Sequence, residues 1–412
     1  SICIGCKACI AACPYDAIFI NPEDKSAEKC NFCAHRLDVG LEPACVVVCP
    51  TQAILVGDMH DPFSAVSEII NRDAVTVRRP EKETRPKLYY KGADQVTLDP
   101  LAARRPDGGL FMWSEQGDVD HQVPSGHPGP WNSSAAAVLS YDIPHRAPWD
   151  YRVSLYTFTK SIAAGAYLVP LLLGALGLLP FTSTLWGVQS VAVALIALLL
   201  TGALLVWDLE HPERFWMVLF KPQWRSWLVR GGFVITAYGG LLAAHAGATW
   251  LGRADLTPAF GWVGGPLAAM TAIYTAYLFA QARARDLWQS PLLPAHLFVQ
   301  ALVAGSGVLM LLASDPSVAD PIGGLFRLSL AAHLLMVFGE ASMGHPTAHA
   351  ALAARNMTRG AYAHFFWIGS ALAVLALISA VTTPIIAALS GLGAILLYEH
   401  AFVQAGQSVP LA

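Results

Sequence analysis

The sequence has 412 residues, of which 55% are hydrophobic and only 13% are charged, and its formal net charge is −3. Soluble globular proteins carry roughly a quarter of charged residues, and the deficit here lies in the residues that follow position 151. The small net charge and the lack of a basic run interleaved with aromatic residues argue against a nucleic-acid partner. We therefore expect two domains, one surrounded by water and one by lipid.

The polar part of the sequence contains all of the cysteines. The eight cysteines lie between Cys3 and Cys49, and we predict a ferredoxin-like α+β iron–sulfur domain over residues 1–56. Residues 57–150 carry turn formers and charges, so we interpret them as an extramembrane linker or docking segment with an anchoring aromatic patch at 110–113. Because the sequence starts at Ser1, close to a cysteine and without an initiator methionine, we expect a fragment or processed product whose upstream part is missing.

The cysteines are spaced as ligands of iron–sulfur clusters. The first run is Cys-x2-Cys-x2-Cys-x3-Cys-Pro, the bacterial ferredoxin pattern for a [4Fe–4S] cluster, and the second run keeps the same ending with a longer middle. Structural zinc is the alternative, but it does not explain a loop of three cysteines with a fourth beside a proline. The predicted metal ligands are Cys3, Cys6, Cys9, Cys13, Cys30, Cys33, Cys45 and Cys49.

An internal repeat bears on how the cysteines are shared. Residues 13–18 are echoed by residues 49–54, and each copy precedes a short apolar, strand-like run, at 19–20 and 55–56. If the eight cysteines form two clusters by themselves, a crossed assignment follows. One cluster then takes the first three cysteines and Cys49, and the other takes Cys13, Cys30, Cys33 and Cys45.

The second cysteine run resembles a known family. Residues 29–36 (Lys-Cys-Asn-Phe-Cys-Ala-His-Arg), 43–45 and 49–51 are similar to the four-cluster ferredoxin subunits of molybdopterin oxidoreductases, such as polysulfide and dimethyl sulfoxide reductases. That family has four cysteine groups, and this sequence matches the last two. The resemblance implies two further groups upstream and shares in up to four clusters, in place of two self-contained ones. The eight cysteines are ligands in either case.

Residues 151–412 are expected to form an all-α membrane domain of about eight helices. Apolar stretches of about 20 residues can cross the hydrocarbon layer, and their backbone must be helical. The sixth stretch is the most polar, since it contains Arg327 and Glu340. Prolines, including Pro321, fall at or beside the proposed ends. The stretches are 154–179, 185–207, 229–251, 259–281, 293–314, 323–343, 362–381 and 384–403.

The membrane region has its own family resemblance. Residues 208–216 (Asp-Leu-Glu-His-Pro-Glu-Arg-Phe-Trp), 221–231, 163–166, 399–400 and 404–407 are similar to the NrfD-type membrane anchors of polysulfide reductase and its relatives. The resemblance implies an eight-helix bundle without haem and a quinone pocket near the iron–sulfur domain. In that family the two domains are usually separate polypeptides, and here they are fused.

Polar residues point to the same pocket. Most of them gather on the membrane side where the first helix begins and helices 2, 4 and 6 end, and oxidation of a quinol there needs hydrogen-bonding groups and a proton acceptor. The candidates for contact with menaquinone or ubiquinone are Tyr156, Lys160, Asp208, His211 and Tyr277. Alternatives remain for each kind of residue. Lysines near helix ends can reach out to the interface, tyrosines can be interfacial anchors, and the carboxylates Glu340 and Glu399 can serve a proton path or helix packing.

These observations predict a multi-pass protein of the bacterial cytoplasmic membrane. It would be a non-catalytic electron-transfer subunit that connects the quinone pool with a separate molybdopterin-containing catalytic subunit. One alternative is a subunit of a quinol:cytochrome c respiratory complex. Another is a redox-gated ion-translocating bundle, which would need carboxylates continuing to the far side. The side of the iron–sulfur domain stays open, because the positive-inside rule favours the cytoplasm while many members of the family place it outside.

Overall fold

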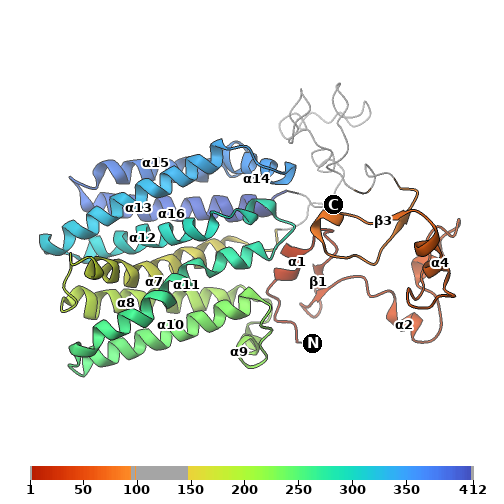
Figure 1. The fold of residues 1–412 in the computed structure, drawn as a ribbon, viewed down its shortest axis with the longest axis horizontal. Coiled ribbons are helices and arrows are strands. Elements are labelled where there is room, and N and C mark those ends of the chain that lie inside the picture. The colour runs from red at the N-terminus through yellow and green to blue at the C-terminus, as the bar shows by residue number, and fades with distance from the viewer. Residues whose placement is uncertain (1, 94–97, 99–146, 410–412) are drawn as a thin grey trace. The chain divides into compact units, whose positions relative to one another are not determined.

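A computed structural model gives the fold and describes residues 2–93, 98 and 147–409 (Figure 1). The chain divides into two compact units: residues 1–12 together with 146–409, and residues 13–145 together with 410–412. The first cysteines therefore belong to the same unit as the membrane helices. The aromatic patch expected at 110–113 lies outside the described residues.

The larger unit is a bundle of apolar helices. Within the described part of the protein, seven segments are long and apolar enough to span a membrane, and the pair α14 and α15, bent by 65°, makes an eighth if it is one span. This confirms the predicted multi-pass architecture. The helices are α7 (Tyr151–Ala175), α8 (Ser190–Trp207, preceded by a π-helical turn at Leu185–Gln189), α10 (Trp227–Trp250), α11 (Thr257–Ala280), α12 (Leu293–Leu312), α13 (Pro316–Ser342), α14 (Ala348–Thr358), α15 (Ala363–Ser379) and α16 (Pro384–Gln407).

Helix α7 is the centre of the bundle, because it packs against α8, α11, α12 and α16. Small residues let it approach α12 closely. A Cβ atom added to Gly165 would lie only 1.8 Å from the carbonyl oxygen of Ala301, and one added to Gly305 would lie 2.1 Å from the carbonyl carbon of Gly165. Such contacts are how membrane helices gain packing energy without a hydrophobic driving force.

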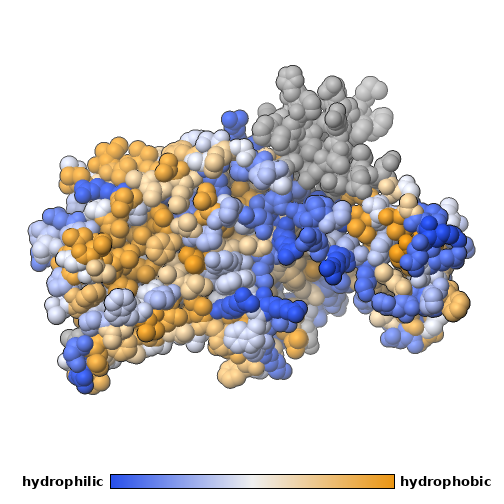
Figure 2. Space-filling view, viewed as in Figure 1, coloured by the Kyte–Doolittle hydropathy of each residue, from blue (hydrophilic) through white to orange (hydrophobic). Residues whose placement is uncertain are grey.

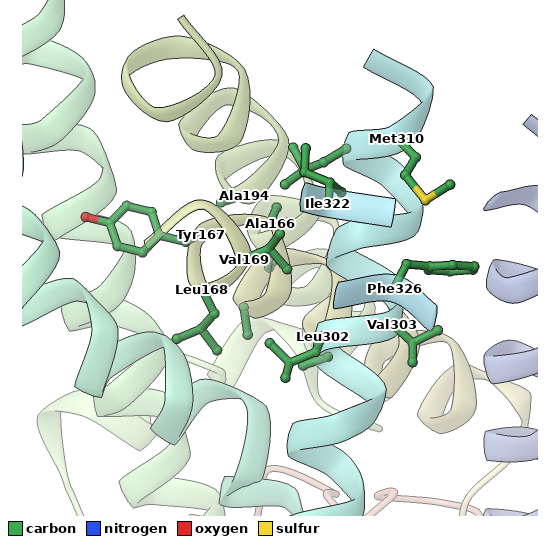
Figure 3. Packing of buried hydrophobic residues seen from close by; sticks show 14 of the residues in the cluster. Ala166, Tyr167, Leu168, Val169, Ala194, Leu302, Val303, Met310, Ile322 and Phe326 are labelled. Atoms are coloured by element: carbon green, nitrogen blue, oxygen red, sulfur yellow. The ribbon is translucent and has the colours of Figure 1, made fainter. Parts of the chain in front are cut away.

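The bundle has an apolar core and an apolar outer surface. Figure 3 shows Tyr167, Leu302 and Phe326 among the core residues of α7, α12 and α13. On the outside, large hydrophobic side chains such as Leu199 and Leu335 are exposed, and Figure 2 shows hydrophobic residues covering much of the helical surface. An apolar exterior is the expected surface of a protein that faces lipid.

One proline prediction is wrong. Pro321 does not stand at the end of a helix, because α13 begins at Pro316 and continues through Pro321. Pro170 and Pro266 also lie inside helices. Pro321 falls in the second turn, where a missing N–H removes only one intrahelical hydrogen bond, and packed membrane helices tolerate such breaks.

The smaller unit contains short elements. The strand-like run predicted at residues 19–20 forms strand β1 (Phe19–Ile20). It pairs antiparallel with β2 (Ala27–Glu28), and β3 (Val75–Thr76) pairs antiparallel with β4 (Tyr90–Lys91). The run at 55–56 forms no strand, and both of its side chains are exposed, so the repeat in sequence is not repeated in secondary structure. Among its described residues, the α-helices of this unit are α2 (Ala34–Leu37), α3 (Ala44–Val47) and α4 (Ala65–Arg72).

Candidate electron-transfer site

Cys3 and Cys6 lie on a curled loop that leads into α1 (Ala8–Ala12), and Cys9 lies in the first turn of this helix. The backbone turns at Gly5 and Lys7, whose φ angles of 68° and 58° are left-handed. This curl brings the N–H of Gly5 within 3.4 Å of the Cys3 sulfur, to which it donates a hydrogen bond. Hydrogen bonds from backbone N–H groups stabilise thiolate ligands and tune the potential of a cluster. The loop therefore fits an iron–sulfur cluster.

The Cys49 sulfur also accepts backbone hydrogen bonds. The Ala53 N–H donates to the Cys49 sulfur at 3.2 Å. This bond, with others from neighbouring residues, lowers the pKa of the Cys49 thiol, which favours the form that binds metal. All eight cysteines are at least partly exposed. Among the described residues, no three His, Cys, Asp or Glu side chains are arranged to hold a single metal ion.

The cysteine loop is bound to the segment that follows α8. The backbone N–H groups of Glu210 and His211 donate to the carbonyl oxygens of Gly5 and Ile4, at 3.3 and 3.2 Å. The contact is so close that a Cβ atom on Gly5 would lie 2.4 Å from the Cβ of Glu210. Glycine is therefore required at this position by both its φ angle and its neighbour.

Charged side chains add to this contact. Lys7 is only 7% exposed, and its Nζ donates to the carbonyl oxygen of Asp208 at 3.1 Å. The same Nζ pairs with the carboxylates of Asp208 at 3.5 Å and Glu210 at 3.1 Å. Arg214 donates from Nη1 to the carbonyl oxygen of Cys3 at 3.1 Å. The Asp-Leu-Glu-His motif at residues 208–211 thus binds the cysteine loop.

Trp149 joins the loop to the last membrane helix. Its indole Nε1 donates to the carbonyl oxygen of Cys6 at 3.1 Å, and its backbone N–H donates to Oε1 of Gln407 in α16 at 3.2 Å. The indole also stacks on Trp288, with ring centroids 5.5 Å apart. A Cβ atom on Gly406 would lie 2.0 Å from Nε1 of Trp288, so this glycine makes room for the stack.

Asp208 has an unusual environment at the end of α8. Burial raises the pKa of its carboxyl group to about 6, although the charges of Lys7 and Arg152 oppose the shift. The Arg152 Nε lies 3.7 Å from Oδ1. In the described structure this buried oxygen accepts no hydrogen bond. Asp208 is thus a carboxylate whose proton affinity suits exchange near neutral pH.

An apolar groove of about 970 Å³ lies beside this contact, between α8 and α10. Its lining includes Ile4, which stands between two of the cysteines, and also Trp207 and Leu209, the two neighbours of Asp208. Tyr274 of α11 lines it as well. Gly202 lines the groove with open space beside its Cα atom. The size falls in the range of small-molecule sites.

The sequence matches two known protein families. Residues 141–407 match the family described as polysulphide reductase, NrfD, and residues 1–59 match the 4Fe-4S dicluster domain. The protein belongs to the NrfD family. It joins an iron–sulfur electron-transfer domain to an NrfD-type membrane anchor in one polypeptide.

The curated relatives match about a fifth to a quarter of this chain. The B subunit of tetrathionate reductase from Salmonella typhimurium is 44% identical over 115 residues, which are 27% of this chain and 45% of that protein. The NrfC homologue of Haemophilus influenzae is 49% identical over 90 residues, 22% of this chain and 40% of that protein. The B component of polysulfide reductase from Wolinella succinogenes is 46% identical over 89 residues, which are 21% of this chain and 47% of that protein. The chain thus spans less than half the length of these relatives.

Two of the quinone candidates, Lys160 and Tyr156, are buried in the NrfD domain. Lys160 is fully buried, and its Nζ donates to the carbonyl oxygen of Ala272 at 2.7 Å and to Oγ1 of Thr275 at 3.0 Å, so it does not reach the interface. It lies 5.3 Å from the ring centroid of Tyr274, the residue that lines the groove. Tyr156 is also buried.

Tyr277 and His211 contact other side chains. Tyr277 stacks on Trp227 with centroids 4.5 Å apart, and His211 lies with Nδ1 2.9 Å from Oε1 of Glu213. None of the five predicted residues is among those that line the groove, although Asp208 stands between two that are. Their role in quinone binding remains a prediction.

Sequence reasoning singled out Glu340 but did not predict the polar cluster of the NrfD domain in which it lies. His296 of α12 and His333 of α13 lie with Nε2 and Nδ1 2.9 Å apart, and Tyr398 packs against both rings. The Tyr398 hydroxyl donates to Oε2 of Glu340 at 3.4 Å. The available signal was the spacing of His296 and Gln300, four residues apart and therefore on one face of an otherwise apolar helix.

Proposed function

We propose that this protein is the iron–sulfur electron-transfer and quinone-interacting anchor subunit of a molybdopterin oxidoreductase. Electrons pass between the quinone pool of the membrane and the iron–sulfur domain, and from there to or from a separate catalytic subunit. The observation that carries this proposal is the apolar groove, which extends from the lipid-facing side of α8 and α10 to Ile4 in the cysteine loop.

The groove suits a quinone in size and chemistry. Its lining is almost entirely aliphatic and aromatic, as an isoprenoid chain and a quinone ring require. Leu199, one of its residues, is 73% exposed, so the groove is open to the acyl chains of the membrane. A quinone can enter from lipid and place its ring next to the loop that holds the first cysteines.

The end of the groove supplies proton chemistry. Quinol oxidation releases two protons with its two electrons, and the [4Fe–4S] clusters supply one-electron transfer. Asp208, with a pKa raised to about 6 by burial, accepts a proton at the ring end of the groove. Lys7 and Arg152 lie close enough to stabilise its ionised form between turnovers.

The proposed catalytic partner rests on the names of the relatives. Two of them are called subunits of tetrathionate and polysulfide reductases, and the sequence resembles the ferredoxin subunits of molybdopterin oxidoreductases. Purification of the native complex followed by metal analysis tests the partner. Molybdenum in stoichiometric amount supports the proposal. A c-type cytochrome without molybdenum would instead favour the quinol:cytochrome c complex.

A pair of glycine variants tests the groove. Gly202→Phe places a ring in the groove, since open space surrounds this position in α8. Gly240→Phe is the matched control, because Gly240 of α10 also has open space beside it and does not line the groove. Both variants are purified as full complexes in lipid nanodiscs, and cluster oxidation state is followed by electron paramagnetic resonance after mixing with menaquinol or ubiquinol.

The proposal predicts that Gly202→Phe abolishes electron exchange with quinol while Gly240→Phe keeps the wild-type rate. Both variants should retain the same cluster signal after chemical reduction. Equal quinol rates in the two variants, with intact cluster signals, would remove the groove as the quinone site.

A further inference from the structure

A second, much smaller cavity lies inside the bundle where α7, α11, α12 and α16 meet. It has about 10 Å³ of space for the centre of a water-sized sphere, which is room for one water molecule. Its walls include Thr157, Phe279, Gln300, Tyr398 and Glu399. The cavity is separate from the apolar groove, since the two share no lining residue.

Two polar atoms at this cavity lack partners. Within the described residues, Oε1 of Gln300 and Oε2 of Glu399 are buried and accept no hydrogen bond. The two side chains are only 2% and 3% exposed. A buried polar atom without a partner is costly, and a water molecule between two acceptors can donate one hydrogen to each. The cavity, its size and the two acceptors therefore fit one bound water.

Glu399 also contacts α7. Its Oε1 accepts a hydrogen bond at 3.4 Å from the hydroxyl of Ser161, the residue next to Lys160. Glu399 and Lys160 interact electrostatically, and Tyr156 and Tyr398 are the other titratable groups within the reach of Glu399. The Lys160 ammonium lies over the ring of Tyr274, which lines the groove.

We propose that Glu399, with a water molecule held between its carboxylate and the amide of Gln300, is a buried proton-exchanging group that is connected to the groove through Lys160. The proposal rests on the quinone function proposed above. On quinol oxidation the two electrons leave through the cysteine loop, one proton goes to Asp208, and the other reaches the side of Lys160. The Lys160 ammonium passes a proton to the Glu399 carboxylate and is reprotonated from the groove, so Glu399 becomes a neutral acid. Quinone reduction runs the same transfers in reverse.

A role in proton transfer explains why Lys160 and Glu399 are buried in the membrane domain. Buried ionisable groups in membrane helices are costly and usually serve transport or proton transfer. Helix packing alone needs no charge at this place, because α7 and α12 already pack through small residues such as Gly165 and Gly305. The cluster of Lys160, Glu399, Gln300 and a water provides a proton store one layer behind the quinone ring.

Infrared difference spectroscopy of the full complex in nanodiscs tests this directly. The spectrum is recorded between the quinone-oxidised and quinol-reduced states, in H2O and in D2O. The variants are Glu399→Gln and Gln300→Leu, with Glu340→Gln as the matched control, because Glu340 is also a membrane carboxyl beside Tyr398 but does not line the cavity. Cluster signals after chemical reduction verify that each variant is folded.

The wild type should show a redox-linked carbonyl band of a protonated carboxylic acid that shifts in D2O. Glu399→Gln should lose this band and slow quinol oxidation by on the order of tenfold or more, as loss of a proton-transfer group does. Gln300→Leu should keep the band and shift its frequency, and Glu340→Gln should leave both band and rate unchanged.

The outcomes separate the two proposals. A wild type that exchanges no electrons with quinol contradicts the quinone function itself. A wild type that does so, together with an unchanged band in Glu399→Gln or loss of the band in Glu340→Gln, overturns the role of Glu399. If Glu399→Gln does not fold, an unshifted band in Gln300→Leu contradicts the proposed water.

Discussion

The Nζ atom of Lys7, in the loop of the first cysteines, lies 3.1 Å from the backbone carbonyl oxygen of Asp208 at the end of α8. The two residues are separated by 201 positions in the sequence. The contact places the Lys7 cation between the cysteine loop and the Asp208 carboxylate beside the groove. Burial raises the pKa of this carboxylate to about 6. Anything that disturbs it should affect electron exchange with the membrane more than the clusters themselves.

Lys7→Met tests the strength of this contact. The substitution removes a hydrogen bond and two ion pairs, and it leaves the buried Asp208 without one of its cations. Breaking a buried pair in this way typically costs about 3 kcal/mol. The unfolding temperature, measured through the cluster absorbance, should therefore fall. Lys87→Met is the control, because Lys87 is exposed, and an equal shift in both variants would contradict the assigned role of Lys7.

Gly5→Ala should separate the cysteine loop from the anchor. A Cβ atom would lie 2.4 Å from the Cβ of Glu210, and alanine is strained at the φ angle of 68°. Strain alone costs about 1–2 kcal/mol. Gly40→Ala is the control for backbone strain alone. Gly40 also has a left-handed φ angle, of 76°, but a Cβ atom added to it would have no other atom within 4 Å.

The expected result is slower electron exchange with quinol in Gly5→Ala at unchanged iron content, and a wild-type rate in Gly40→Ala. The measurement is stopped-flow optical spectroscopy with iron and sulfide analysis on each protein. A wild-type quinol rate in Gly5→Ala would show that the close approach to Glu210 is not needed.

The rate of quinol oxidation should depend on pH through Asp208. Burial raises the pKa of this carboxyl to about 6, so the group is ionised and can accept a proton above that pH, and it is protonated and blocked below it. The rate is therefore expected to fall as the pH drops through about 6. In Asp208→Asn the rate should be low and should lose this inflection. The same inflection in the variant would assign it to another group.

The membrane helices and the iron–sulfur domain could be predicted from the sequence, because both depend on local sequence features. Hydrophobic length decides whether a segment spans lipid, and the cysteine spacing follows from the geometry of a cluster loop. Proline is a weaker local signal, since its cost depends on packing around it. That is why Pro321 proved to lie within α13.

The candidate site was less accessible from sequence, because it depends on contacts between distant segments. The groove is lined by ordinary leucines, valines and glycines of α8 and α10, which carry no polar signal. The contact between Lys7 and Asp208 requires knowledge of which segment the cysteine loop binds. Tyr277 was the candidate predicted on α11, but Tyr274, three residues before it, is the tyrosine that lines the groove.

The central claim is that electrons move between a quinone in the groove of the NrfD domain and the iron–sulfur domain of the same polypeptide. The most direct measurement mixes the purified, chemically oxidised protein with quinol and follows the clusters by rapid-freeze electron paramagnetic resonance. The account predicts reduced [4Fe–4S] signals that appear in the wild type and in Gly240→Phe but not in Gly202→Phe. Protein that contains zinc in place of iron and sulfide, or clusters that stay oxidised in the presence of quinol, would contradict it.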